Sequence, residues 1–121
     1  MLTTDELMLE GEQVYTRFCA SCHQVNGQGI PPAFPSLVDT AVTTGPRDDH
    51  IRLILDGVAG SAMQAFGKQL DARQVAAVVQ YERHAWGNNP ISERFIQNFT
   101  VFHGVQRFCH AGSMSLTLTE I

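Results

Sequence analysis

The hydrophobic pattern of the first eighteen residues predicts an amphipathic helix. Thr3 and Glu6 have the spacing of a capping box, which marks the beginning of a helix. Small and apolar residues then recur at helical spacing, so that they share one face. These residues are Leu7, Gly11, Val14, Tyr15 and Phe18. We therefore expect a first helix that ends near Phe18.

Two more helices are predicted downstream. The first runs over about 48–56 and can stop at Gly57; its apolar positions repeat at helical spacing, at Ile51, Ile54, Leu55 and Val58. The second opens at Asp71, a good N-cap with Gln74 three residues later, and ends near Gly87. No strand-like alternation of useful length occurs before residue 90. The fold class is therefore predicted to be all-α.

The segment between the first two helices carries the chemistry. Its glycines and prolines, in CASCHQVNGQGIPPAFPSL, prevent long regular structure and favour a tight, wrapped loop. The loop begins with Cys19, Cys22 and His23, which match the attachment pattern of c-type haem. In that pattern two thiols add to the haem vinyl groups and the adjacent imidazole coordinates iron. We expect one covalent haem c here, with His23 as an axial iron ligand.

Two other interpretations of the same motif stay open at this point. A Cys-x-x-Cys pair can be a redox dithiol, and two cysteines with a histidine can form part of a zinc site. Zinc requires further ligands, and the candidate second half is Cys109 with His110. That pair is distant and lacks a second cysteine at the matching spacing, so haem is favoured over both.

A haem held by His23 has a sixth coordination position, for which Met63 is the best candidate. Met63 lies in the loop GSAMQAFG between two predicted helices, where it could fold over the opposite haem face. The other possible ligands are less well placed: Met1, Met8, Met114, His50, His84, His103 and His110. The expected apolar wall of the haem pocket consists of Ile30, Phe34, Leu37, Leu55, Phe66 and Leu70.

Composition and charge narrow the class of protein. The chain has 121 residues, of which 44% are hydrophobic and 17% charged, as in a globular domain without a membrane span. The formal charge of −4 gives no basic field for nucleic acid or an anionic lipid surface. The first eighteen residues lack the basic start and apolar stretch of a secretory signal, so we expect signal and anchor to be absent from this chain. Residues 1–88 are predicted to form the domain, and residues 89–121 an extension that is disordered or foreign to it.

From Gly11 to Gly87 the sequence resembles the class I cytochrome c family. The likeness rests on CASCH, NGQGIPPAFPSL, SAMQAFG and QVAAVVQYERHAWGN, and the last three most resemble the cytochrome c domain of subunit II of bacterial haem-copper oxidases. The resemblance implies helices wrapped around one haem, with the first and last helices crossing near Gly11. It also implies that the carbonyl of Pro31 holds the other ring nitrogen of His23. We expect Trp86 to pack in the core.

The expected function is one-electron transfer without catalysis by the domain itself. Ligation of the iron by histidine and methionine leaves no vacancy for a substrate and raises the reduction potential. The resemblance implies a redox protein as partner, either an oxidase copper centre or another cytochrome, in the periplasm or at the outer face of the cytoplasmic membrane. Alternatives are a free-standing periplasmic cytochrome, a haem domain of another periplasmic redox enzyme, and a five-coordinate haem sensor or peroxidase.

Overall fold

The computed structural model describes residues 2–90, and within them the fold is all-α, as predicted. Helix α1 (Thr4–Phe18) is followed by the single turn α2 (Ala20–His23). After a long loop come α3 (Ala41–Thr44) and α4 (Arg47–Asp56). A second loop leads to α5 (Ala72–His84), which continues into the 3₁₀ turn η1 (Ala85–Gly87). This part of the chain contains no strand, only an isolated bridge between Ile30 and Phe34.

The predicted starts of α1 and α5 are confirmed, because their capping residues act as their sequence suggested, whereas α5 ends at His84, before the predicted end near Gly87. The Thr3 hydroxyl accepts from the Glu6 N–H, and the Glu6 carboxylate accepts from the Thr3 N–H in return. Asp71 and Gln74 form the same reciprocal pair at the start of α5. Each box satisfies two backbone donors that the first turn of a helix otherwise leaves free. The short helices α2 and α3 were not predicted, since four residues are too few to show a helical period.

Helices α1 and α5 cross at a glycine. A β-carbon on Gly11 would lie 2.1 Å from the carbonyl oxygen of Ala77 and 2.7 Å from the Cβ of Tyr81, so no larger residue fits there. Below the crossing, the rings of Tyr15, Tyr81 and Trp86 pack together with centroids 5.1 to 5.6 Å apart. The predicted crossing near Gly11, with Tyr15 and Tyr81 close by, is therefore confirmed, and Trp86 packs against the core.

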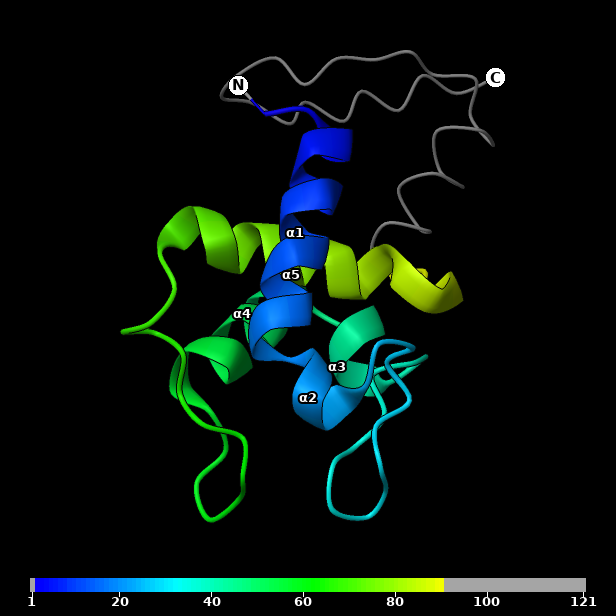
Figure 1. Ribbon diagram of the computed structural model, residues 1–121, viewed down its shortest axis with the longest axis vertical. Helices are drawn as coiled ribbons and strands as arrows, with labels where there is room; N and C mark the ends of the chain where they lie inside the picture. Colours follow the sequence, from blue (N-terminus) through cyan, green and yellow to red (C-terminus); the bar gives the residue numbers. More distant parts are fainter. Residues whose placement is uncertain (1, 91–121) are drawn as a thin grey trace, which may run out of the picture.

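The crossed helices α1 and α5 form the upper part of the domain in Figure 1, and the two long loops lie below them, at the end where α2 lies. The buried apolar side chains come from α1, α4, α5 and the second loop: Val14, Tyr15, Ile54, Phe66, Leu70, Val75, Val78 and Val79. One loop follows α2 and the other joins α4 to α5, so that the His23 loop and the Met63 loop lie on the same side of the molecule. The loop that follows His23 and the loop that carries Met63 therefore lie on one side of the fold.

Asn88 fastens the end of the described domain. Its side-chain amide donates to the carbonyl oxygens of Leu37 and Glu82, and its side-chain oxygen accepts from the N–H of Asp39. The domain boundary predicted near residue 88 stays a prediction. The predicted extension from residue 89 lies almost wholly outside the described residues, as do Cys109, Met114 and the histidines at 103 and 110. Within residues 2–90, no helix combines the length and apolar character needed to span a membrane.

Candidate haem site

A change of chain direction at Cys19 places the three motif residues together. Cys19 caps the C-terminus of α1, and its carbonyl accepts from the N–H of His23 at 2.9 Å, which closes the single turn of α2. Cys19 and Cys22 are therefore one turn apart, on neighbouring positions of one helical surface. Both thiols are unpaired and half-buried, and His23 is buried. The geometry supplies two thiols and an imidazole from one turn of chain, as haem attachment requires.

The imidazole of His23 is held in one tautomer by a backbone carbonyl. Its Nδ1 lies 2.9 Å from the carbonyl oxygen of Pro35. A carbonyl oxygen can only accept, so Nδ1 carries a proton, and in the neutral imidazole Nε2 then carries a free lone pair. The lone pair is what a metal ion binds, and the hydrogen bond at the other nitrogen fixes the ring's orientation. The ring is thus prepared to act as an iron ligand.

The prediction that Pro31 supplies this carbonyl is wrong, because Pro35 occupies the position. The chain reverses between Ile30 and Phe34, where each N–H donates to the other residue's carbonyl at 2.8 and 3.0 Å. This reversal places Pro31 at the exposed tip of the loop and returns Pro35 to His23. The family resemblance identified a proline carbonyl in this loop, but sequence position alone did not show which of its three prolines returns.

Hydrogen bonds tie the rest of this loop to the helices. The Tyr15 hydroxyl donates to the Gln24 carbonyl at 2.5 Å, and the Trp86 indole N–H donates to the Val25 carbonyl at 3.0 Å. Gly29 has a φ of +62°, and a β-carbon there would lie 2.4 Å from the Phe34 carbonyl oxygen. Glycine alone tolerates both the positive φ and this close approach. The loop therefore holds His23 and Pro35 in a fixed relation.

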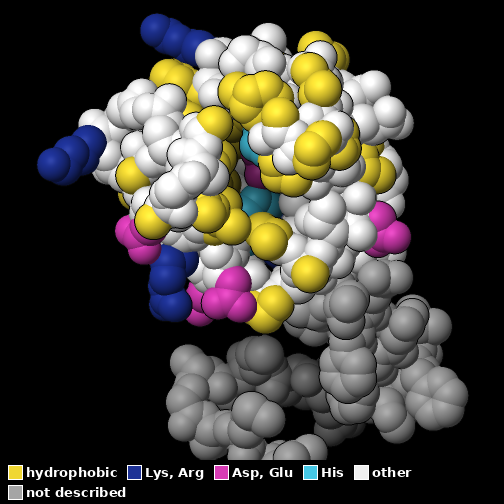
Figure 2. All heavy atoms as spheres, turned by 90° about the horizontal axis from the view of Figure 1, so that it is seen from below, with side chains coloured by type: hydrophobic (Ala, Val, Ile, Leu, Met, Phe, Trp, Pro, Cys, Tyr) yellow, Lys and Arg dark blue, Asp and Glu magenta, His cyan; other side chains and the backbone are white. Residues whose placement is uncertain are grey.

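The predicted pocket wall divides into buried and exposed members. Phe66 and Leu70 are buried in the core, and Phe34 and Leu37 are half-buried. Ile30 and Leu55, by contrast, expose 53% and 36% of their surface. Figure 2 shows hydrophobic side chains on both sides of a hollow whose floor contains histidine and acidic side chains. Apolar side chains around a hollow are typical of a ligand-binding groove.

The Met63 loop forms the other side of the site. The Met63 carbonyl accepts from the Val58 N–H at 3.0 Å, and the Ser61 hydroxyl accepts from the Met63 N–H at 3.1 Å. Gly57 ends α4 with a φ of +66°, and its own β-carbon position lies 2.7 Å from the Met63 carbonyl oxygen. The side chain of Met63 is half-buried and packs against the core cluster. Its backbone is thus well fixed, and ligation of iron by its sulfur stays a prediction.

Two ionisable groups beneath the motif were missed by sequence reasoning. His50, assigned to the surface or a structural role, is buried on α4, and its Nε2 lies 2.7 Å from a carboxylate oxygen of the buried Glu82 on α5. Burial, and then the negative charge of Glu82, raise the pKa of the Cys19 thiol from its usual 9.0 to about 12. The helical spacing placed both His50 and Glu82 near apolar positions, and this was the signal that could have indicated their burial.

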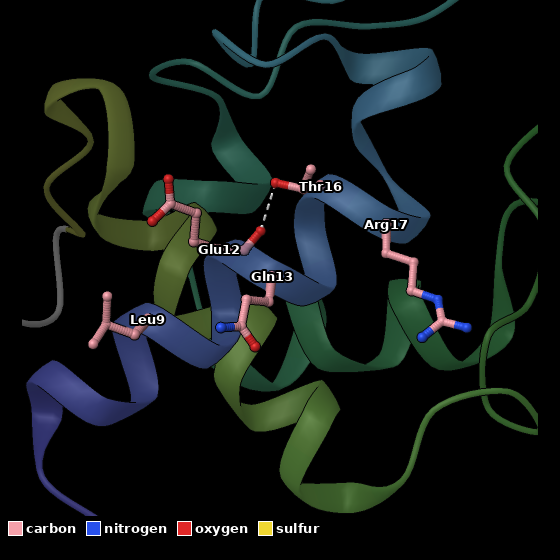
Figure 3. Close-up of a pocket in the computed structure, with 5 residues that line it drawn as sticks. All are labelled: Leu9, Glu12, Gln13, Thr16 and Arg17. Carbon is pink, nitrogen blue, oxygen red and sulfur yellow. Dashed lines mark hydrogen bonds between the residues drawn. The ribbon is translucent and has the colours of Figure 1, made fainter.

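A separate hollow lies on the exposed side of α1, and its lining residues differ in chemical type from those of the haem motif. It is lined by Leu9, Glu12, Gln13, Thr16 and Arg17, and the Thr16 hydroxyl donates to the Glu12 carbonyl within the same helix (Figure 3). Its lining comes from a single helix and contains no histidine or cysteine. Among residues 2–90, no three histidine, cysteine or acidic side chains cluster as they would around a metal ion. Within the described residues, the haem motif is therefore the site whose side chains are suited to hold a cofactor.

Fold and site together define a monohaem c-type cytochrome domain. Residues 6–81 match the family model described as "Cytochrome C oxidase, cbb3-type, subunit III". The chain belongs to this family of c-type cytochromes, and its cofactor is a covalently bound haem c. Cys19, Cys22 and His23 fit that cofactor on structural grounds, through their shared turn and the free Nε2 lone pair. The family match does not extend to subunit II in particular.

Curated relatives include a cytochrome c-552 and cytochrome c subunits of dehydrogenases. Over 93 residues the chain is 36% identical to cytochrome c-552 of Thermus thermophilus, covering 65% of this chain and 70% of that protein. Over 88 residues it is 32% identical to the cytochrome c subunit of the alcohol dehydrogenase (quinone) of Gluconacetobacter polyoxogenes, covering 64% of this chain. It spans only 19% of that subunit.

Solved structures confirm the fold. Cytochrome cL from Methylophaga aminisulfidivorans superposes with a TM-score of 0.63 at 18% identity, covering 82% of this chain and 66% of that one. The dihydro-heme d1 dehydrogenase NirN gives a TM-score of 0.56 at 27% identity, over 67% of this chain and 17% of that one. The all-α architecture expected from the sequence is therefore that of c-type cytochromes.

Proposed function

We propose that the chain carries single electrons through a low-spin haem c whose iron is ligated by His23 and Met63. The observation that supports this most directly is the hydrogen bond from His23 Nδ1 to the Pro35 carbonyl, which leaves Nε2 as a ligand atom. Haem supplies the redox chemistry, by alternating between ferric and ferrous iron. The chain's own residues supply attachment, ligand orientation and an apolar surround.

Met63 is proposed as the second axial ligand because of where its loop lies. The loop hangs on the same side of the crossed helices as the His23 loop, and its backbone is fixed by hydrogen bonds from Val58 and to Ser61. A thioether is a neutral, polarisable ligand that favours ferrous iron and raises the potential. With both axial positions filled, the iron has no open site for a substrate. The domain is therefore proposed to be an electron carrier and not itself an enzyme.

The apolar rim of the hollow is proposed as the docking face for the redox partner. Val25, Ile30 and Val58 expose 75%, 53% and 45% of their surface; Val25 and Ile30 lie on the loop after α2, and Val58 lies on the loop after α4. Electron-transfer encounters are small and short-lived, so a partly apolar rim is sufficient. A partner that docks there would approach the haem edge without contact with the crossed helices.

The expected partners are a terminal oxidase or another periplasmic redox protein. A relay to or within an oxidase is supported by the family description, and a role beside a dehydrogenase by the subunit relatives. Because those subunits are several times longer than this chain, their substrates are not carried over. A periplasmic location, or one at the outer face of the cytoplasmic membrane, is proposed because haem attachment through thioethers is chemistry of that compartment in the family.

A potentiometric titration of the matured protein, with and without carbon monoxide, tests the function. We expect a reversible one-electron couple and a reduced spectrum that carbon monoxide leaves unchanged at neutral pH. Binding of carbon monoxide by the reduced wild-type protein would show an open iron, and would support the sensor or peroxidase alternative.

To separate the partner classes, reduced protein is mixed with a haem-copper oxidase, and oxidised protein with a reduced quinone-dependent alcohol dehydrogenase. The mixture with the faster electron transfer identifies the class of redox partner.

A further inference from the structure

A buried acid–base pair lies directly beneath the haem attachment motif. His50 Nε2 and Glu82 Oε2 are 2.7 Å apart, and the two side chains are 2% and 5% exposed. The pair joins α4 to α5, and Glu82 also lies beside the thiol of Cys19, whose pKa it helps to raise. A hydrogen bond between two buried ionisable groups is electrostatically strong, because little water screens it.

Haem attachment changes the surroundings of Glu82. The free Cys19 thiol can donate a hydrogen bond to the Glu82 carboxylate, whereas a thioether sulfur has no proton to donate. After attachment, His50 is the side chain whose hydrogen bond to Glu82 remains. In the haem-loaded protein, hydrogen bonding to the Glu82 carboxylate therefore depends more strongly on His50.

The second ring nitrogen of His50 is the place where a proton can be added. Nδ1 is buried and has no hydrogen-bond partner in the described part of the chain. With Nε2–H donating to an ionised Glu82, a neutral His50 leaves the pair with a net charge of −1. A proton on Nδ1 makes the pair a neutral ion pair. The two states differ by one unit of charge buried beneath the motif.

Other ionisable groups near the pair do not provide this exchange around neutral pH. Tyr15 of α1 and Cys19, which caps α1, both interact with Glu82, and burial raises the pKa of Tyr15 well above its usual value. From α5, Tyr81 also faces Glu82, and burial raises its pKa too. On the same helix, the buried Arg83 donates to the Gly45 carbonyl at 2.8 Å, and at the start of α4 Arg47 donates to Gln80. Arginine keeps its charge at every physiological pH.

We propose that the His50–Glu82 pair takes up one proton from solvent when the domain accepts an electron, and releases it when the electron leaves. The proton comes from a solvent hydronium ion: an O–H bond of that ion breaks as the N–H bond to Nδ1 of His50 forms, and water is released. The electron comes from the redox partner, so the inference rests on the proposed function. Reduction removes one positive charge from the iron, which makes a neutral pair more favourable than a pair with a charge of −1. The domain would thereby couple electron transfer to proton transfer.

The test is the midpoint potential of the haem-loaded protein measured from pH 5 to pH 9. We expect the wild-type potential to fall as pH rises within this range, because the reduced pair holds one proton more than the oxidised pair. In the His50→Leu/Glu82→Leu double variant, which keeps the site filled with apolar atoms, the potential should be independent of pH in this range. His84→Gln is the matched control, since it removes a half-buried histidine outside the pair, and it should keep the wild-type dependence. A double variant with the wild-type dependence would assign the effect to other groups and overturn the proposal.

A second measurement does not depend on the variants folding. The ring protons of His50 are followed by NMR against pH in the reduced and the oxidised wild-type protein. We expect the titration midpoint of His50 to lie at higher pH in the reduced protein. Equal midpoints, or a potential that does not vary with pH, would overturn the proton coupling while leaving the electron carrier intact. A haem without a reversible one-electron couple would instead overturn the proposed function, and the coupling with it.

Discussion

Gly11 of α1 lies against the backbone of α5, so that a β-carbon at residue 11 would come within 2.1 Å of the Ala77 carbonyl oxygen. That distance is well below van der Waals contact, and the obstructing atom is backbone, which cannot rotate away. Gly11→Ala must therefore push the two helices apart. Overpacking of this kind costs about 1–3 kcal/mol, and we expect the loss at the upper end, measured by guanidinium unfolding of the haem-loaded protein.

Gln13→Ala is the control for the helix crossing. Gln13 is an exposed residue of the same helix, and its replacement should change the free energy of unfolding by less than about 0.5 kcal/mol. If Gly11→Ala were as stable as Gln13→Ala, the close approach of α1 and α5 would be contradicted.

The N-cap of α5 gives a second prediction. The Asp71 side chain accepts from the Gln74 N–H at 2.8 Å, and the Gln74 side chain accepts from the Asp71 N–H at 3.0 Å. Asp71→Ala removes the first bond and should cost about 1 kcal/mol, while Asp71→Ser keeps an acceptor and should cost much less. Thermal unfolding followed by circular dichroism compares the two. Equal melting temperatures for the alanine and serine variants would argue against the capping role.

The Cys19 thiol makes the stability of the haem-free chain depend on pH. Burial raises its pKa from 9.0 to about 12, so the folded chain keeps the thiol neutral where the unfolded chain ionises it. The free energy of unfolding should therefore fall as pH rises above 9, until the folded thiol also ionises near pH 12. Cys19→Ala removes this part of the dependence, as thioether formation does. Urea unfolding at pH 8 and pH 10 measures it, and an identical loss in wild type and Cys19→Ala would contradict the shifted pKa.

Much of the fold could be predicted from the sequence because its signals are local. The starts of α1 and α5 could be predicted from the capping boxes at Thr3 and Asp71. The helices themselves could be predicted from the apolar residues that follow each box at helical spacing. The spacing of Cys19, Cys22 and His23 predicted the attachment site, and the structure places all three residues on one turn of chain. Gly11 required the family resemblance, because a helix crossing depends on a second segment far away in sequence.

The parts that sequence reasoning missed depend on contacts between distant segments. Pro31, Pro32 and Pro35 have similar local surroundings, and only the reversal between Ile30 and Phe34 decides which carbonyl reaches His23. The His50–Glu82 pair joins residues 32 positions apart, and each alone resembles an ordinary polar residue of a helix. Of the predicted pocket residues, Ile30 and Leu55 are exposed, and their contact with haem stays a prediction.

The role of Met63 is tested by its replacement in the matured protein. Met63→Ala removes the sulfur ligand, so the reduction potential should fall and the reduced iron should bind carbon monoxide. Met8→Ala is the matched control, because Met8 is a half-buried residue of α1 and should change neither property. Potentiometry and carbon monoxide difference spectra measure both effects. An unchanged Met63→Ala protein would mean that another residue ligates the iron.

The most direct test of the central claim is the absorption spectrum of protein matured in a host with c-type haem attachment machinery. Spectra of the oxidised and reduced forms are extended to the far red, where an iron–methionine charge-transfer band is found. We predict a low-spin c-type spectrum, a haem that stays bound after denaturation, and that far-red band in the oxidised protein. Covalent haem without the band would contradict ligation by Met63, and a chain that acquires no haem would contradict the account as a whole.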